Sequence, residues 1–180
     1  MQNPARLSLT RDRPTLSGMN AEQILGPGQQ HESIARMIGL WVAQETFAPS
    51  LRSGSGKRSG RLECQSICNG LFVVGNYAQM GGRNEVTYSG LGVFGVDPTT
   101  QEVTWYWFDS LGGMPYSPAR GGWNGDTLVL VGRDEHGRPN RHYTFAFEGY
   151  DRLRFVIEDA ADDGLTWHTF MDARCLKTAP

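Results

Sequence analysis

Large aromatic residues alternate with titratable ones in the middle of the chain, and this pattern could support chemistry. In the segment Thr104–Asp109, every second position is occupied by Trp105, Trp107 and Asp109. Successive side chains of a β-strand point to opposite faces, so these three are expected on one face. Such a face could hold the apolar body of a small ligand, while its titratable groups contact the ligand's polar group.

Pairing across the expected hairpins extends this face to neighbouring strands. Counting outward from each turn gives four cross-strand pairs, because antiparallel partners lie opposite each other. The pairs are Tyr77 with Tyr88, Phe94 with Trp105, Trp105 with Arg120, and Asp109 with Tyr116. One face then carries Tyr77, Tyr88, Phe94, Trp105, Trp107, Asp109, Tyr116 and Arg120, and the other carries Thr87, Ser89, Thr104, Ser117 and Ala119. A slip of one residue would reverse the faces of a strand.

The aromatic face is the expected interior and the expected ligand-binding surface. Its ligand-binding candidates are Tyr77, Tyr88, Trp105, Trp107, Tyr116 and Arg120. A charge in such an interior must be paired, hydrogen-bonded, or in contact with water or ligand. Arg120 could therefore hold a carboxylate, phosphate or enolate. The structural alternative is an internal ion pair between Arg120 and Asp109, or an Asp109 that only organises its turn.

Asp109 and His142 are the candidate catalytic residues. A carboxylate and an imidazole can exchange a proton with a bound substrate near neutral pH. The cysteines and histidines of the chain do not show the spacing of a zinc site, so no metal ligands of that kind are expected.

Charge and composition exclude several classes of protein. Seventeen Lys and Arg residues face nineteen Asp and Glu, giving a net charge of −2. A domain that holds phosphate backbones is normally basic, so no nucleic acid partner is expected. No run approaches the roughly 20 apolar residues of a membrane span, and the N-terminus lacks the apolar core of a secretory signal. With an odd number of cysteines, three, these features predict a cytoplasmic protein with reduced thiols.

Turn signals divide the chain from residue 39 onward into short segments. Turn signals recur at nine places, and the Asn-Gly and Asp-Gly pairs among them, such as Asn69-Gly70 and Asn124-Gly125, supply the positive φ angles of tight hairpins. The intervening segments are rich in Thr, Val, Tyr, Phe and Trp, which favour strands. About ten antiparallel strands predict an all-β, up-and-down barrel, because closure removes exposed sheet edges. A β-sandwich is the alternative. Gly90, Gly92 and Gly95 in one long strand favour the barrel, since glycine permits bending.

The N-terminal region has a different composition. Residues 1–27 are polar and without period, which predicts a flexible arm, and the true start could be Met1 or Met19. Residues 28–38 are expected to form a short helix. Residues 28–180 then make a single barrel domain.

Five stretches over roughly residues 31–175 resemble the uncharacterised bacterial domain-of-unknown-function family 1579. They are His31 with Gly39-Leu40-Trp41, Tyr88–Asp97, Trp107–Ser110, Gly122–Leu128 and Asp163–Trp167. The resemblance implies a lipocalin-like (calycin-type) barrel and brings no catalytic mechanism with it. It also implies that Trp41 closes one end of the barrel, with Arg174 of the last strand stacked on it. His31, in the expected helix at the same end, is expected to be a packing or capping residue.

Three functions remain open. The first is the binding of a small apolar or amphipathic molecule that carries a polar or anionic group. The second is a cofactor-free cyclase, isomerase or dehydratase that uses the same cavity. The third is haem binding through His168, because some ten-stranded barrels related to lipocalins hold haem by a single histidine. Apart from haem no cofactor is expected, and the sequence leaves the oligomeric state open.

Overall fold

The computed structural model describes residues 26–49, 55–112, 115–161 and 165–178. Their elements are α1 (Gln29–Ala35), β1 (Gly39–Phe47), β2 (Gly56–Ile67), η2 (Cys68–Gly70), β3 (Phe72–Met80), β4 (Val86–Val96), β5 (Val103–Asp109), β6 (Ala119–Asn124), β7 (Thr127–Arg133), β8 (Pro139–Phe147), β9 (Arg152–Ala161) and β10 (Thr166–Thr178). The expected arm, residues 1–27, lies outside the described residues except for its last two, and so do both candidate start methionines.

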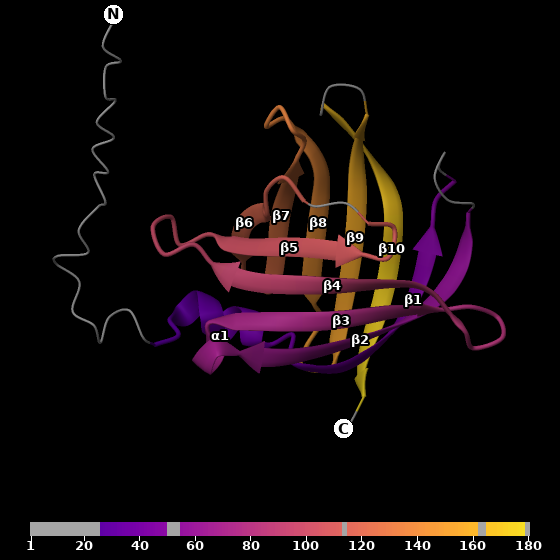
Figure 1. Ribbon diagram of the computed structural model, residues 1–180, viewed down its shortest axis with the longest axis horizontal. Helices are drawn as coiled ribbons and strands as arrows, with labels where there is room; N and C mark the ends of the chain where they lie inside the picture. The colour runs from indigo at the N-terminus through magenta and orange to yellow at the C-terminus, as the bar shows by residue number, and fades with distance from the viewer. Residues whose placement is uncertain (1–25, 50–54, 113–114, 162–164, 179–180) are drawn as a thin grey trace, which may run out of the picture.

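The ten strands close into one barrel. Each strand pairs antiparallel with its neighbours in the sequence, and β10 returns to pair with β1. In Figure 1, β3–β5 cross the view horizontally, while β7–β10 run roughly at right angles to them. The predicted all-β, up-and-down barrel with a short N-terminal helix is confirmed. Because the sheet closes on itself, its strands have no free edge, unlike those of a sandwich.

Helix α1 covers one end of the barrel. Ile34 and Met37 are almost completely buried there beside Trp41, the third residue of β1. The Trp41 indole Nε1 donates a hydrogen bond of 2.7 Å to the Met37 carbonyl. At the start of the helix, the Gly28 amide donates to His31 Nδ1 at 3.0 Å, so the expected capping role of His31 is confirmed. The indole plug and the capped helix together close this end.

A lysine, not the expected arginine, lies over Trp41. Lys177 Nζ is 4.9 Å from the centre of the indole ring, a distance typical of a cation–π contact. Arg174 is exposed and pairs with Gln44 of the neighbouring strand β1. The expected stacking of Arg174 is therefore wrong. Arg174 and Lys177 are an odd number of residues apart in β10, so their side chains lie on opposite faces of the wall.

Period-two alternation fills the barrel with apolar side chains near α1. The buried core includes Trp41, Val73, Phe94, Val103, Trp105, Leu128, Leu130, Phe145, Phe147 and Leu153. Trp105 lies at the centre of this cluster, stacked on Phe94 at 5.5 Å and edge-on to Tyr143 at 4.7 Å between ring centres. Aromatic rings therefore occupy the middle of the barrel.

Two interior glycines of β4 make room for these rings. A Cβ atom on Gly90 would lie 2.1 Å from the Trp107 ring, and one on Gly92 would lie 2.6 Å from Trp105 Nε1. Neither glycine has a positive φ angle. Their role is therefore to let the indoles lie against the strand, in addition to any bending that they permit.

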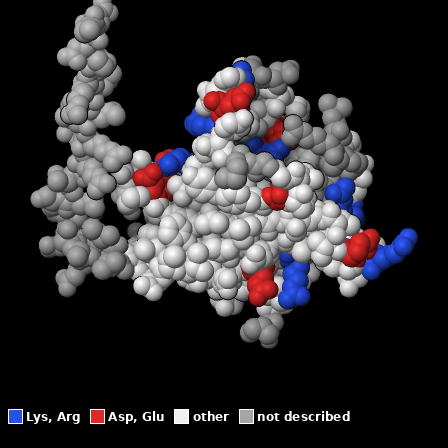
Figure 2. Space-filling model, in the orientation of Figure 1, with Lys and Arg blue, Asp and Glu red and all other residues white. Residues whose placement is uncertain are grey.

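The outer surface over β3, β4 and β5 carries few charges. Figure 2 shows this face almost uniformly uncharged, with acidic and basic side chains at its margins. Outward residues such as Phe72, Leu91 and Tyr106 are partly exposed on it. Within the described part of the chain, α1 has seven residues, and no helix there reaches the length and apolarity that a membrane crossing requires.

Candidate functional site

The interior of the barrel changes character away from α1. At that far end, the inward positions of seven strands carry polar or charged side chains. We call this set the polar end: Glu45, Arg58, Tyr77, Gln79, Tyr88, Asp109, Arg141, Tyr143 and Asp159. Polar groups inside a barrel require partners, and most of these side chains are hydrogen-bonded to one another.

One cluster at the polar end is built around Glu45 of β1. Tyr77 donates a hydrogen bond of 2.5 Å to Glu45 Oε1, and Gln79 Nε2 donates one of 3.1 Å to Glu45 Oε2. Arg58 Nη1 donates to Gln79 Oε1 at 3.1 Å. Burial raises the pKa of Glu45, although these hydrogen bonds and the charge of Arg58 oppose the shift. Burial and the neighbouring carboxyl group also raise the pKa of Tyr77, so its phenol remains a donor.

A second cluster joins β4 and β5. The Tyr88 hydroxyl donates to Asp109 Oδ2 at 2.9 Å and accepts a hydrogen bond of 3.0 Å from Trp107 Nε1. Burial raises the pKa of Tyr88, while the bond from Trp107 and the charge of Arg141 oppose the rise. Arg141 of β8 therefore acts on the same interior space as the Tyr88–Asp109 pair.

Arg141 is the interior arginine on the far wall. Its Nε atom lies 2.5 Å from Asp159 Oδ1, and its side chain is 32% exposed. The guanidinium also lies 5.5 Å from the centre of the Phe170 ring. Its charge opposes the effect of burial, which raises the pKa of Tyr143. A cation here is both paired and partly open to solvent, which is the condition for contact with an incoming anion.

An apolar cavity lies between the polar end and α1. Its volume is about 60 Å³. It is lined by Met37, Trp41, Leu62, Gly75, Gly92, Phe94, Trp105, Trp107, Phe145, Leu153, Phe155 and Cys175. Burial raises the pKa of the Cys175 thiol to about 12, so the thiol stays neutral. The cavity is therefore a small uncharged space beneath a charged one.

A wider groove of about 750 Å³ lies beside β1, β2 and β10. Gln44, Lys57, Ser59 and Arg174 are among its lining residues. These side chains lie on the outer face of the wall, because they alternate with the inward residues of their strands. The groove is open to solvent, and it reaches the polar end because Glu45 and Arg58 also line it. Its lining shares no residue with that of the apolar cavity.

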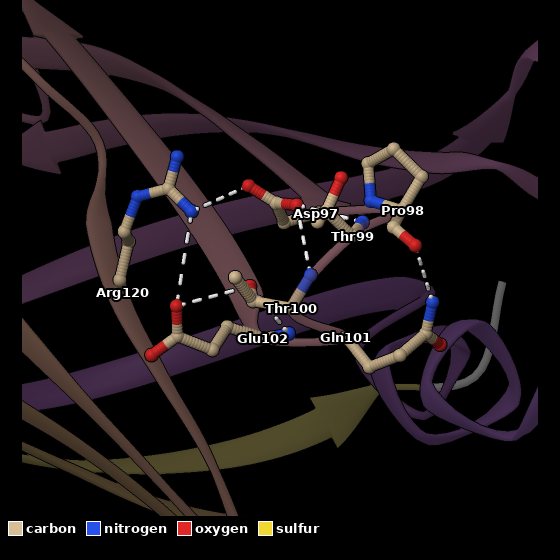
Figure 3. Close-up of polar contacts among 7 residues, drawn as sticks. All are labelled: Asp97, Pro98, Thr99, Thr100, Gln101, Glu102 and Arg120. Atoms are coloured by element: carbon tan, nitrogen blue, oxygen red, sulfur yellow. Dashed lines mark hydrogen bonds and ion pairs between the residues drawn. The ribbon is translucent and has the colours of Figure 1, made fainter.

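Arg120 lies outside the barrel, so its expected interior position is wrong. β5 and β6 pair Trp105 with Ala119 and Thr104 with Arg120, one residue away from the expected register. Arg120 Nη1 donates to Asp97 Oδ2 at 2.7 Å, and its side chain is 42% exposed. Figure 3 shows Arg120 beside Asp97 and Glu102 of the turn that joins β4 to β5. The bond from Arg120 and two backbone amides hold the pKa of Asp97 at about 2.

The same register difference changes two other expectations. Ala119, expected on the outer face, is buried in the interior. Tyr116, expected on the aromatic face, precedes β6 and is 79% exposed. The structure therefore does not bring Tyr116 or Arg120 to the interior, whereas Tyr77, Tyr88, Trp105, Trp107 and Asp109 lie there together.

The two candidate histidines lie apart. His142 alternates with the inward Arg141 and Tyr143, so it lies on the outer face, where its ring stacks on Trp167 at 3.5 Å between centres. It cannot act with Asp109 on one substrate inside the barrel. His168 pairs with Asp159 at the polar end and is exposed. Among the described residues, no group of three or more His, Cys, Asp or Glu could hold a metal ion.

The match to a family covers most of the barrel. Residues 26–177 match the family described as "Protein of unknown function (DUF1579)". The chain belongs to this family. The resemblance noted from five short stretches is therefore confirmed over the whole described domain.

Two solved structures share this family member's barrel. Rv2717c from M. tuberculosis superposes with a TM-score of 0.62 at 10% identity, over 84% of this chain and 99% of that one. The S-type phycobiliprotein lyase CPES from Guillardia theta has a TM-score of 0.61 at 12% identity, over 90% and 99% of the two chains. At these identities the likeness shows the fold alone. Comparison with curated proteins gives no match.

Three residues of the polar end were not among the sequence-based candidates: Glu45, Gln79 and Arg141. Two of them carried a usable signal. Glu45 lies on the same strand face as Trp41, Ala43 and Phe47, at every second position. Arg141 likewise shares a face with Tyr143, Phe145 and Phe147. A charge that takes one place in an apolar period-two series is expected to point inward with the rest of the series. The same alternation identified Asp109 after Trp105 and Trp107.

Proposed function

We propose that the barrel binds a small amphipathic molecule. The apolar part of the ligand enters the aromatic cavity, and its polar or anionic group stays at the polar end. One observation carries the proposal: an uncharged cavity of about 60 Å³ lies directly beneath inward charged side chains. Ligand sites in proteins typically combine such an apolar lining with a few placed polar groups.

The size of the cavity limits the ligand. Drug-sized ligands occupy pockets of roughly 300 Å³ or more, so the cavity accepts only a group of a few heavy atoms unless the rings move. A haem does not fit this space. His168 is exposed at the barrel end, outside the cavity lining. The interior therefore favours a short apolar group over haem.

Arg141 takes the place that the sequence suggested for Arg120. Its side chain is 32% exposed, and its carboxylate partner among the described residues is Asp159. Planar guanidinium groups bind carboxylates through more than one N–H group, so Arg141 can contact a second anion while it keeps Asp159. Arg58, which donates to Gln79 from one Nη atom, is the second cation available at this end.

Catalysis in the same space is the second candidate function. It is favoured by two carboxyl–phenol pairs that face the interior, Glu45 with Tyr77 and Asp109 with Tyr88. A carboxylate and a phenol can move a proton at a bound carbonyl compound. One structural relative is named a lyase, so barrels of this shape include at least one protein named as an enzyme.

A chain-length series of carboxylates tests the binding proposal. Butanoate, hexanoate and octanoate are titrated against the full chain, with intrinsic tryptophan fluorescence and calorimetry as readouts. Affinity should rise with chain length until the cavity is filled. Arg141→Met should weaken binding of each carboxylate at least about fivefold, in line with the loss of a charge-assisted hydrogen bond. Arg120→Met, the matched control on the outer face, should leave it unchanged.

Two results would contradict this placement of the ligand. If no member of the series binds, and native mass spectrometry of the protein from its own host retains no small molecule, the binding proposal is wrong. If both arginine variants weaken binding equally, the anion is held outside the barrel.

A further inference from the structure

The outer face of β9 and β10 brings two positive charges together. Arg154 and Arg174 are direct cross-strand partners there, and like charges in this position destabilise a sheet. Arg154 donates to both carboxylate oxygens of Asp172, at 3.1 and 2.8 Å. Arg174 is exposed and makes no hydrogen bond or ion pair with any other described residue, although its charge also acts on Asp172. This arrangement leaves one guanidinium without a counter-charge of its own.

Arg174 lines the wide groove beside β1, β2 and β10, here called the outer groove, whose volume is about 750 Å³. Small-molecule sites typically have volumes of roughly 300–1,000 Å³. Lys57 of β2 also lines the outer groove and is exposed, and within the described part of the chain it likewise lacks a hydrogen-bond or ion-pair partner. Gln44 of β1 and Ser59 of β2 complete this part of the lining, with an amide and a hydroxyl group that can donate. The outer groove therefore offers two free cations together with neutral donors.

The two carboxyl groups that line the outer groove already have partners. Asp172 is bound by Arg154, which lies outside the lining and holds the pKa of Asp172 below its usual value. Glu45 is 3% exposed and accepts a hydrogen bond from Tyr77 at the polar end. Arg58, a third cation in the lining, adds to the positive charge. Neither carboxyl group therefore neutralises the two free cations.

The spacing of the two free cations suits one anion with several acceptor oxygens. Lys57 pairs with Thr46 of β1, and Arg174 pairs with Gln44 of the same strand. The cations are thus two strands and two residues apart on one face, which places their Cα atoms roughly 12 Å from each other at the spacings of a sheet. Their long side chains can converge from this distance on a group that lies over β1.

We propose that the outer groove binds a small molecule through a phosphate or diphosphate group. Arg174 donates to the phosphate oxygens from β10 through its planar fork of N–H groups, and Lys57 supplies a second charge from β2. Gln44 and Ser59 donate between them. A phosphate group has about two negative charges and three strong acceptor oxygens, so it uses both cations and the neutral donors, whereas a carboxylate uses fewer of them. The inference goes beyond the proposed binding function, because it concerns a second site on the outer face of the barrel.

Inorganic pyrophosphate and inorganic phosphate are the probes, titrated against the full chain by calorimetry and phosphorus NMR. Pyrophosphate should bind more tightly, because it presents more charge to the two cations. Arg174→Met and Lys57→Met should each weaken pyrophosphate binding at least about threefold, through the loss of a charged donor. Arg61→Met is the matched control, since Arg61 lies on the same strand and outer face as Lys57 but does not line the groove. It should change the affinity less than about twofold.

The variants replace exposed side chains, so they should fold. Arg174→Met also removes the like charge opposite Arg154, so its melting temperature should not fall. If pyrophosphate does not bind at millimolar concentration, the inference is wrong. It is also wrong if Arg61→Met weakens binding as much as Arg174→Met, because the anion is then held by the general charge of this face.

A third variant separates this inference from the proposed function. Arg141→Met, inside the barrel, should leave pyrophosphate binding unchanged, because Arg141 does not line the outer groove. If it weakens pyrophosphate binding as much as Arg174→Met does, the anion binds at the polar end and the inference is wrong. The carboxylate series decides the proposed function independently, since its expected response is to Arg141→Met.

Discussion

Two arginine–aspartate pairs lie on opposite faces of the same barrel wall. Arg120 and Asp97 meet outside at 2.7 Å, whereas Arg141 and Asp159 meet inside. The chemistry of the two pairs is the same, but of the two only the inner pair lies at the polar end, next to the apolar cavity. The wall is one residue thick, so a single step along a strand decides which of these environments a side chain enters.

Register therefore matters more than residue type in assigning function to this barrel. Thr104 pairs with Arg120, and moving that pairing by one residue would place the guanidinium beside Trp105. Arg141 pairs with Gly132 of β7 and Asp159 of β9. Both of these positions face the interior, so the Arg141 side chain does as well. The comparison of inner and outer faces can be tested by substituting neighbours that differ in little except the face they occupy.

The largest expected contrast is between adjacent residues of β7. Leu128 is fully buried inside, and Val129 is 37% exposed outside. Leu128→Ala should lower the free energy of unfolding by about 3 kcal/mol, because it removes buried methyl groups and leaves a cavity. Val129→Ala should lower it by less than about 1 kcal/mol. Urea unfolding followed by circular dichroism measures both, and equal losses would contradict the assignment of faces in β7.

A second contrast compares glycines of the two faces. An alanine Cβ at Gly90 would lie 2.1 Å from the Trp107 ring, whereas one at Gly122 would meet nothing within 4 Å. Gly90→Ala should therefore cost about 2 kcal/mol of stability through overpacking. Near-ultraviolet circular dichroism should also change, since the indole must move.

Gly122→Ala is the control for this overpacking effect. It should change the free energy of unfolding by no more than about 0.5 kcal/mol, and it should leave the aromatic spectrum as it is. A Gly90→Ala variant as stable as Gly122→Ala would mean that Trp107 does not lie against β4.

The barrel itself was predictable because its signals are local. Tight turns and period-two runs depend on residues a few positions apart, and the expected pair of Phe94 with Trp105 is confirmed. The interior position of Tyr88 was also predicted, although Tyr88 pairs with Gln79 and not with Tyr77. A shift of two residues preserves the face of a strand, so this error did no harm.

The site was less predictable because register over a long connection is not local. Between β5 and β6 the chain passes through Tyr116 and the turn at Leu111–Gly112, and counting across this connection was wrong by one residue. That single step placed Arg120 and Ala119 on the wrong faces. The polar cluster around Glu45 needed pairing between β1, β2 and β3, which a hairpin count across one turn does not supply.

The two arginines give a smaller contrast in stability. Arg141→Met should lower the free energy of unfolding by about 1–2 kcal/mol, since it leaves Asp159 unpaired in a site that is about a third exposed. Arg120→Met should lower it by less than about 1 kcal/mol, because the Arg120 side chain is more exposed than that of Arg141 and its charge is screened by solvent. Thermal unfolding at low and high salt measures both variants, and a larger loss for Arg120→Met would reverse the comparison.

The smallest contrast concerns the pH dependence of two carboxyl groups in neighbouring strands. The pKa of Glu45, buried inside, is raised above its usual value, while Glu63 lies on the outer face of β2, opposite Leu40. A carboxyl group with a raised pKa in the folded state stabilises the fold below its unfolded pKa, near 4.5. That contribution is lost as the pH rises through the folded value.

The Gln side chain of Glu45→Gln stays neutral at every pH. The free energy of unfolding of this variant, relative to that of the unmodified chain, should therefore increase as the pH rises above 4.5. Glu63→Gln, an outward substitution in the neighbouring strand, is the control for removing a carboxyl group in the same urea titrations between pH 4 and 8. A Glu45→Gln variant that instead loses relative stability with rising pH would mean that the charged carboxylate, held by Tyr77, Gln79 and Arg58, is the form that the barrel prefers.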